Sequence, residues 1–185
     1  MHEDKKNQMK NLFKIGIAII TITLVYSCTT QSKYAAANIE SLLKTNQFTF
    51  VAERANPTNL DVVNVMNSIP GSSSSRMLNL DPGYTIEIKA DELNVTLPYF
   101  GRMYSANMDP SKNSYRFTTK DFIVDKKEGK KGSTVFTIVA NDQQNIRNIN
   151  MEVFKNGKTY VWIESNDRQS ISYDGYITAN SIRKK

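Results

Sequence analysis

The chain has 185 residues, and its 24 Lys and Arg against 18 Asp and Glu give a formal net charge of +6 at pH 7. It holds one His, His2, and one Cys, Cys28, so an internal disulfide is excluded. We expect His2 to leave with a cleaved signal and Cys28 to carry lipid, which would exclude Ser-His-Asp or Cys-His catalysis and Cys/His zinc sites in the mature domain. The length suits one domain, and the modest basic excess lacks the dense stripe typical of nucleic-acid binding. No nucleic-acid partner is therefore expected.

A basic start and an apolar run mark the N-terminus. Lys10 and Lys14 precede the run Ile15–Val25. As a helix this run covers only about 16 Å, whereas a bilayer core is about 30 Å thick. Residues 1–27 are therefore predicted to be a cleaved secretory signal rather than a membrane span. Met9 lies close before the run, so it is a second candidate for the start of that signal.

The segment Val25–Cys28 resembles a bacterial lipobox, with an apolar residue at minus three and a small residue at minus one. The resemblance implies that Cys28 is lipidated, that the chain is cut before it, and that the new amino group is acylated. Two or more acyl chains anchor a protein stably, so a cell-envelope location is expected. Thr29–Gln31 lack the acidic run that resembles a surface-export signal, which favours the outer membrane, facing the periplasm. The alternatives are a secreted protein with one spare thiol and a cytosolic Cys that follows a buried helix.

A short tether and a helix are predicted to follow the lipid. Residues 28–33 are polar and reach at most about 20 Å when extended. Between residues 34 and 46, Ile39, Leu42 and Leu43 fall on one face of a predicted helix, which we expect to pack on the domain.

From residue 47 the hydrophobic period changes to two, which is typical of strands. Long helical crossovers are missing, so the sheet should be antiparallel. We expect one mainly β domain over 47–180, an antiparallel sandwich or partly closed barrel of about eight strands with one N-terminal helix, followed by a basic tail at 181–185. The predicted strands are Phe48–Ala52 with an end at Asn56-Pro57, Tyr84–Ala90, Leu93–Tyr99, Tyr115–Val124, Ser133–Ala140, Ile146–Lys155, Lys158–Glu164 and Ile171–Thr178.

The segments between and within the predicted strands contain further patterns that indicate turns, loops or short helices. Asn156-Gly157 predicts a two-residue hairpin turn with positive φ at both positions, and Gly175 suggests a bulge or tight bend. Asn59–Ile69 suits either a short helix or a strand, and Pro70–Ser75 is predicted to be an irregular loop. Lys126–Gly132 is predicted to be an exposed basic loop, which is either a solvated hairpin tip or a contact for anionic lipid.

Several short motifs carry a resemblance to a known family. They are Phe48–Ala52, Asn79-Leu80 with Gly83-Tyr84, Leu97–Arg102 with Tyr104-Ser105, Asn156-Gly157 and Asn166–Gly175. Together they resemble the domain-of-unknown-function family numbered 4251, a group of small bacterial envelope lipoproteins. The likeness runs from about Phe48 to Ile177, and it implies a mostly β lipoprotein domain and no activity.

Aromatic and cationic side chains supply the candidate ligand-binding residues. Aromatic faces can stack on a sugar ring or a peptide, and an Arg can hold a carboxylate or phosphate with two hydrogen bonds. The alternative is that the aromatic residues form core on a β face and that the Arg residues form structural pairs. The candidates are Tyr99, Phe100, Arg102, Tyr104, Arg168 and Tyr173.

Carboxyl pairs are the remaining route to catalysis. Glycoside hydrolysis needs two carboxyls about 5 to 9 Å apart across a cleft. The candidate pairs are Asp91 with Glu92 and Glu164 with Asp167, but neighbours on a turn point apart. We therefore expect a non-catalytic binding or structural module without metal or cofactor, whose partner is an envelope protein, a glycan or a small ligand. The alternative is a carboxylate-based envelope hydrolase acting on a glycan.

Overall fold

The computed structural model describes residues 36–104 and 113–180. The chain divides into the units Met1–Lys33 and Tyr34–Lys185, and only the second contains described residues. The predicted signal, the lipidation site Cys28, the tether and the basic tail lie outside the described residues. The side chains are described from Ile39 onward.

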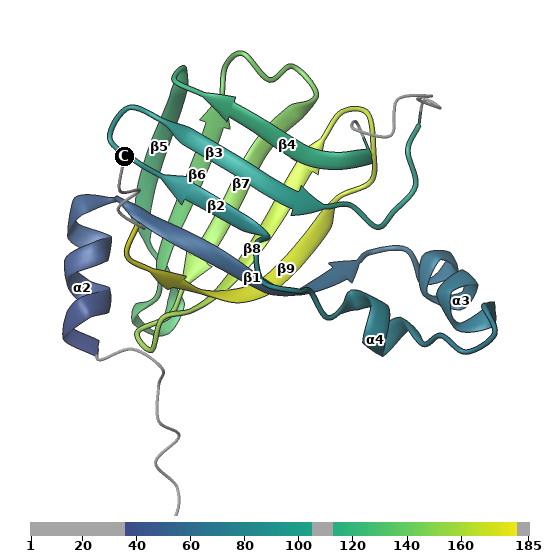
Figure 1. Cartoon of the computed structure of the whole chain (residues 1–185). Coiled ribbons are helices and arrows are strands. Elements are labelled where there is room, and N and C mark those ends of the chain that lie inside the picture. The colour runs from purple at the N-terminus through teal and green to yellow at the C-terminus, as the bar shows by residue number, and fades with distance from the viewer. Residues whose placement is uncertain (1–35, 105–112, 181–185) are drawn as a thin grey trace, which may run out of the picture. The chain divides into compact units, whose positions relative to one another are not determined.

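Within the described ranges, nine antiparallel strands form one sheet in the order β4-β3-β2-β1-β9-β8-β7-β6-β5. The sheet curls into a nearly closed barrel whose two edges are β4 and β5 (Figure 1). The prediction of a mainly β, antiparallel, partly closed barrel is confirmed, and the sandwich alternative is wrong. The strands are β1 (Phe48–Pro57), β2 (Thr85–Ile88), β3 (Leu93–Pro98), β4 (Ser114–Thr119), β5 (Phe122–Glu128), β6 (Thr134–Ala140), β7 (Ile146–Val153), β8 (Lys158–Ser165) and β9 (Ile171–Thr178).

The ninth strand comes from a turn inside the segment Tyr115–Val124, where one strand was expected. β4 ends at Thr119, and the Thr119 hydroxyl oxygen accepts the Asp121 N–H at 3.0 Å. The Asp121 carbonyl in turn accepts the Asn141 N–H at 2.9 Å. This turn contains no Gly or Pro, so the usual turn signal is missing. β5 then continues to Glu128, so the first part of the predicted basic loop is strand.

The helices outnumber the one that was expected. α2 (Ala36–Thr45) is the predicted helix, and α3 (Leu60–Ser68) settles the ambiguous segment as helix. α4 (Ser74–Leu78) lies partly in the predicted loop. A capping side chain begins each of α3 and α4. The Asn59 side chain accepts the Asp61 N–H at 2.8 Å, and the Ser73 hydroxyl accepts the Arg76 N–H at 3.4 Å.

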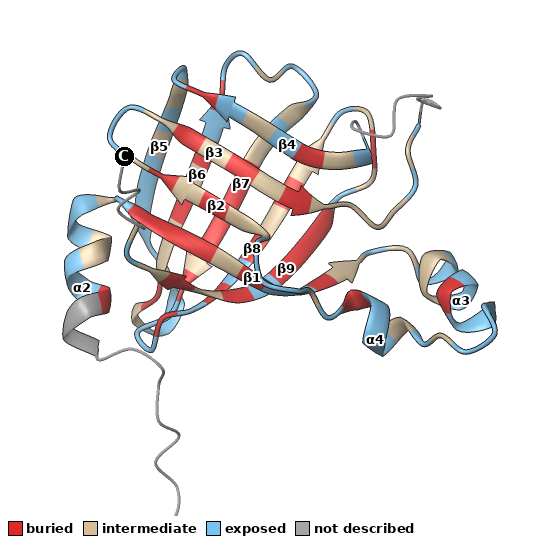
Figure 2. Ribbon diagram, in the orientation of Figure 1, coloured by how far each residue is buried: buried red, intermediate tan, exposed pale blue. Residues whose placement is uncertain are grey.

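Alternate residues of the strands are buried, as the red segments of the ribbon in Figure 2 show, so their side chains form the core of the barrel. Phe48, Phe50 and Phe136 are fully buried, and the rings of Phe48 and Phe136 meet edge to face at 5.3 Å. α2 packs on this barrel as expected. The Lys126 ammonium donates to the Leu43 carbonyl of α2 at 2.6 Å.

Two glycines shape the strand connections. Gly175 pairs with Ala52 beside a register shift in β1, and a Cβ at Gly175 would lie 2.0 Å from the Val51 carbonyl oxygen. The predicted bulge is therefore confirmed. Gly157 has φ +81°, but Asn156 does not share a positive φ. The predicted two-residue turn is wrong, because four residues separate β7 from β8 and the Gly157 N–H donates to the Phe154 carbonyl.

Candidate functional site

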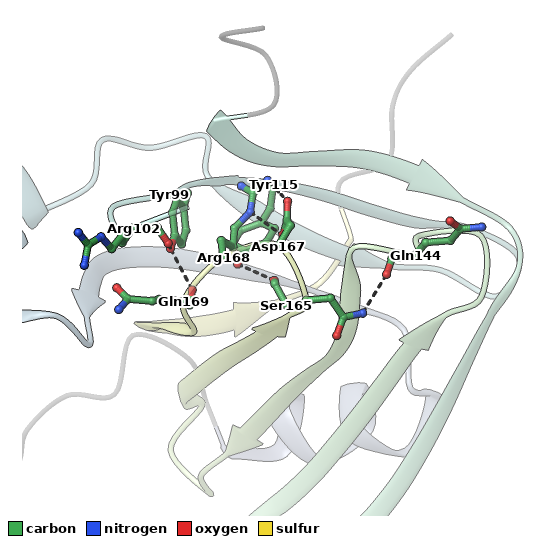
Figure 3. A network of polar contacts seen from close by, with 9 residues as sticks. Tyr99, Arg102, Tyr115, Gln144, Ser165, Asp167, Arg168 and Gln169 are labelled. Carbon is green, nitrogen blue, oxygen red and sulfur yellow. Dashed lines mark hydrogen bonds and ion pairs between the residues drawn. The ribbon is translucent and has the colours of Figure 1, made fainter. Parts of the chain in front are cut away.

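One region gathers half of the sequence-predicted site residues. We call Tyr99, Tyr115, Arg168 and Tyr173 the tyrosine–arginine cluster. The Arg168 guanidinium lies 5.0 Å from the ring centre of Tyr99 and 5.1 Å from that of Tyr115 (Figure 3). It also forms a two-pronged ion pair with Asp167, at 2.9 Å from Nη2 and 3.1 Å from Nε. Arg168 is only 6% exposed, so this cation is part of the packed protein.

The tyrosine hydroxyls of the cluster bind the protein's own oxygens. Tyr173 donates to the Pro98 carbonyl at 2.6 Å, and the Tyr115 hydroxyl lies 2.9 Å from the Ser165 hydroxyl. Tyr99 reaches the Gln169 carbonyl at 3.0 Å (Figure 3). These bonds join the end of β3 and the start of β4 to the β8–β9 connection, so the cluster acts as a cross-link between chain segments far apart in sequence.

Burial keeps these phenols protonated. It raises the pKa of Tyr99 to about 12 and the pKa of Tyr115 to about 12, and it holds the pKa of Tyr173 well above its ordinary value. The neighbouring Arg168 cation lowers the pKa of all three tyrosines, but this effect is smaller than the increase caused by burial. At neutral pH each hydroxyl therefore remains a hydrogen-bond donor.

The other predicted residues lie outside this packed group. Phe100 is partly buried against the core. Arg102 is exposed, and Tyr104 is 64% exposed. The Arg102 carbonyl accepts the Gln169 N–H and the Tyr99 hydroxyl, each at 3.0 Å, and the Tyr104 N–H donates to the Asp167 carbonyl at 2.8 Å. The structure thus packs the side chains of Tyr99, Arg168 and Tyr173 together, whereas Arg102 and Tyr104 border them through their backbone and keep exposed side chains.

A second region is open to solvent. We call it the outer groove, a hollow of about 620 Å³ along β8, β9 and the β7–β8 turn. Known small-ligand sites have volumes of about 300 to 1,000 Å³. The groove combines three ammonium groups, two carboxylates and two aromatic rings. Its lining residues are Glu53, Lys131, Phe154, Lys155, Asn156, Lys158, Thr159, Tyr160, Asp174 and Gly175.

Strand alternation places the Tyr160 ring on the outside of the barrel. Its neighbours Thr159 and Val161 are buried, whereas Tyr160 is 37% exposed. In the sheet Tyr160 stands opposite Asp174 of β9, and its ring centre lies 5.8 Å from that of Trp162. Two flat side chains are thereby held on a rigid strand, next to a carboxylate.

Two turns bring lysines to the same groove. Lys131 belongs to a 3₁₀ turn at Lys130–Gly132, and its φ of 57° is in the left-handed region. A Cβ at Gly132 would lie 2.4 Å from Cε and 2.8 Å from Nζ of Lys155, so the Lys155 ammonium rests against this turn. Lys158 follows one residue after Gly157, at the start of β8. The cationic end of the groove is therefore built from two neighbouring connections.

Sequence reasoning missed this groove, although one signal could have found it. The segment Lys158–Glu164 is predicted as a strand, and if Val161 and Ile163 face inward, then Tyr160 and Trp162 must face outward. The sequence places Lys131 in a basic loop but does not bring Lys155 to it, because the approach of Lys155 to the turn Lys130–Gly132 depends on the order of the strands.

In each carboxyl pair predicted for catalysis, one member is bound to a cation. Glu92 forms an ion pair with Lys89 at 2.7 Å, and Asp167 pairs with Arg168. Over residues 36–104 and 113–180, no group of three or more His, Cys, Asp and Glu could hold a metal ion. In those same ranges no helix has the length and apolar character needed to cross a bilayer.

The fold and these two regions define a nearly closed antiparallel β-barrel domain with a filled interior. The model of the family described as a domain of unknown function (DUF4251) matches residues 30–177. The chain belongs to this family. The match includes α2, so this helix is part of the family domain together with the barrel. A search of curated proteins gives no match to the chain.

Proposed function

We propose that this protein is a non-catalytic binding module, held in the cell envelope by lipid on Cys28, and that the outer groove is its binding site. One observation carries the proposal: Tyr160 and Phe154, which are 37% and 40% exposed, line a 620 Å³ groove together with three lysines. Large aromatic side chains exposed beside such a hollow are typical of binding surfaces. The tyrosine–arginine cluster, in contrast, is occupied by its own contacts.

The lipid anchor would keep the groove close to envelope components. The lipobox-like segment Val25–Cys28 ends two residues before the family match begins. α2 begins at Ala36, so the eight residues 28–35 limit the distance between lipid and domain to at most about 28 Å. A ligand that is itself part of the envelope would therefore be met at high effective concentration.

The anchor is tested by the intact mass of the protein purified from its own membranes. We expect the mass of residues 28–185 plus a diacylglyceryl group and a further acyl chain. A Cys28→Ser variant should lose the lipid and leave the membrane fraction. An unlipidated mass that starts at another residue would contradict the anchor, while the binding role of the groove would still stand.

The binding site is tested by photo-crosslinking in intact cells. A photoreactive amino acid in place of Tyr160 should capture an envelope component. The matched control is the same amino acid in place of Ile123, which is 61% exposed on β5 and is not among the groove residues. Equal capture from both positions, or no capture from position 160, would contradict the proposed site.

A second function, hydrolysis of a glycan, is favoured by one specific observation. Glu53 and Asp174 both line the groove, and they come from different strands rather than from one turn. Two carboxylates facing one cleft are the minimum that glycoside hydrolysis requires. If a bound oligosaccharide is cleaved by the native protein but not by Glu53→Gln or Asp174→Asn, the protein is a glycan hydrolase rather than a non-catalytic binding module.

A further inference from the structure

We infer that the outer groove binds an anionic saccharide, with the acid group at its lysines and the sugar ring on its aromatic side chains. The inference rests on the proposed function, because it names the ligand class for the same groove. It is carried by three features of the lining residues: where the positive charges gather, where the flat apolar surfaces lie, and what the carboxylates can accept.

The positive charge is concentrated at one end of the groove. Lys131 and Lys155 come from two neighbouring turns, Lys158 begins β8 directly after one of them, and the Lys155 ammonium rests against the turn that contains Lys131. An ammonium group is a strong point-charge donor for a carboxylate or a phosphate. A bound acid group would offset the mutual repulsion of these lysines, so this end selects for negative charge.

The part of the groove that is formed by β1 and β9 suits hydroxyl groups. Glu53 and Asp174 carry carboxylates, which are acceptors only when ionised and therefore pair with hydroxyl donors. The Asp174 carboxylate already accepts the Asn56 amide at 2.7 Å, which fixes its position. Asn156 uses its side-chain oxygen for the Lys158 N–H at 3.1 Å, so its NH₂ group is left to donate.

Flat apolar surfaces lie in the same hollow. Tyr160 and Phe154 are both more than one third exposed, although an aromatic ring would be more stable in the core. The C–H face of a pyranose ring packs well against such a ring, and aromatic side chains lose little entropy on binding because they have few rotatable bonds. A small inorganic anion would leave these surfaces unused.

The two carboxylates also decide between a discrete ligand and a bilayer surface. An anionic bilayer presents a sheet of negative charge, which Glu53 and Asp174 would repel. A saccharide can place its acid at the lysine end and its hydroxyls at the carboxylate end. The division of charge within the groove therefore favours an acidic sugar over lipid headgroups.

The test is titration calorimetry with oligogalacturonate, a chain of sugar acids, and with its fully methyl-esterified form, which keeps the rings and loses the charge. We expect saturable binding of the acid and binding at least about ten-fold weaker for the ester. Citrate serves as an anion without a ring, and phosphatidylglycerol vesicles serve as the lipid surface. Both should bind more weakly than the oligosaccharide acid, whose binding should weaken as salt is added.

A second readout is available in the groove itself. Trp162 is the chain's one Trp and its ring lies close to that of Tyr160, so its fluorescence should change on binding and give the same affinity.

Variants then tie the binding to the groove. Lys155→Gln with Lys158→Gln should weaken binding about ten-fold or more, and so should Tyr160→Thr. The control Lys44→Gln with Lys120→Gln removes the same charge from exposed positions outside the groove and should change affinity less than about two-fold. Circular dichroism of every variant confirms that it is folded.

Specific results would overturn the inference. Equal binding of acid and ester would exclude selection for charge, equal binding of citrate would exclude selection for a sugar, and tighter binding of vesicles would assign the groove to lipid. If the acid does not bind while position 160 still crosslinks in cells, the ligand class is wrong and the proposed function stands. If both fail, the proposed function is wrong as well.

Discussion

The tyrosine–arginine cluster and the outer groove use the same chemistry, aromatic rings beside cations, with opposite results. Arg168 is 6% exposed, lies against two tyrosine rings and pairs with Asp167, whereas Tyr160 is 37% exposed among lysines. In the cluster these groups bind one another and join separate segments of the barrel. In the outer groove, aromatic rings and ammonium groups are instead open to solvent. The comparison teaches that residue type alone does not reveal a binding site, because the direction of each side chain decides what it can meet.

Removal of the buried cation should give the largest effect. Arg168→Met keeps most of the side-chain stem but leaves the Asp167 carboxylate, which is 22% exposed, without its partner. We expect a loss of about 3 kcal/mol in the free energy of unfolding, measured by urea denaturation. Arg116→Met is the matched control, since Arg116 is exposed on β4, and it should change stability by less than about 0.5 kcal/mol. Equal losses at both positions would show that the cluster is no more structural than the surface.

Loss of one buried hydroxyl should have a smaller effect. Tyr173→Phe removes the donor to the Pro98 carbonyl and keeps the fully buried ring. A buried acceptor left without a partner costs about 1 to 3 kcal/mol. Tyr104→Phe removes a hydroxyl that is open to solvent and should not shift the urea midpoint. A Tyr173→Phe variant as stable as the native protein would argue that water replaces the lost bond.

The overall fold can be predicted from the sequence because the patterns that indicate it are local. Alternation over segments such as Leu93–Tyr99 and the absence of helical crossovers together predict an antiparallel sheet. The ninth strand was missed, since the turn at Lys120-Asp121 is held by a hydroxyl and a distant Asn141 rather than by Gly or Pro. α4 was missed because the serines that suggest a loop also cap helices.

The sites were harder to predict because they depend on strand order. The sequence separates Tyr99 from Arg168 by many residues, and the barrel brings them within 5.0 Å. Equally, Lys155 reaches the turn that contains Lys131 only because the β5–β6 and β7–β8 turns are neighbours. The candidate residues chosen for their chemistry were therefore assembled by contacts between segments far apart in the chain, which no local pattern encodes.

The buried phenols should make stability fall at high pH. The pKa of Tyr99 and that of Tyr115 are raised from 10.0 to about 12, so between these values the unfolded chain loses protons that the folded protein keeps. The stabilisation is complete below pH 10 and is lost as the pH rises toward 12. Urea denaturation across this range measures it, and Tyr99→Phe with Tyr115→Phe should flatten the dependence. An unchanged slope in that double variant would assign the effect to other groups.

The smallest effect on stability is expected for a substitution in the outer groove. This prediction tests the difference between the groove and the tyrosine–arginine cluster. Tyr160→Thr keeps a residue that favours strands, and it removes a ring that is already partly exposed and whose main aromatic neighbour is Trp162. The free energy of unfolding should fall by less than about 1 kcal/mol. The same substitution at Tyr115, which is 3% exposed, should cost about 2 to 3 kcal/mol, because it leaves a cavity beside Arg168. If Tyr160→Thr were as destabilising as Tyr115→Thr, the exposed ring would be explained by its contribution to folding, and the groove would lose its strongest argument for binding.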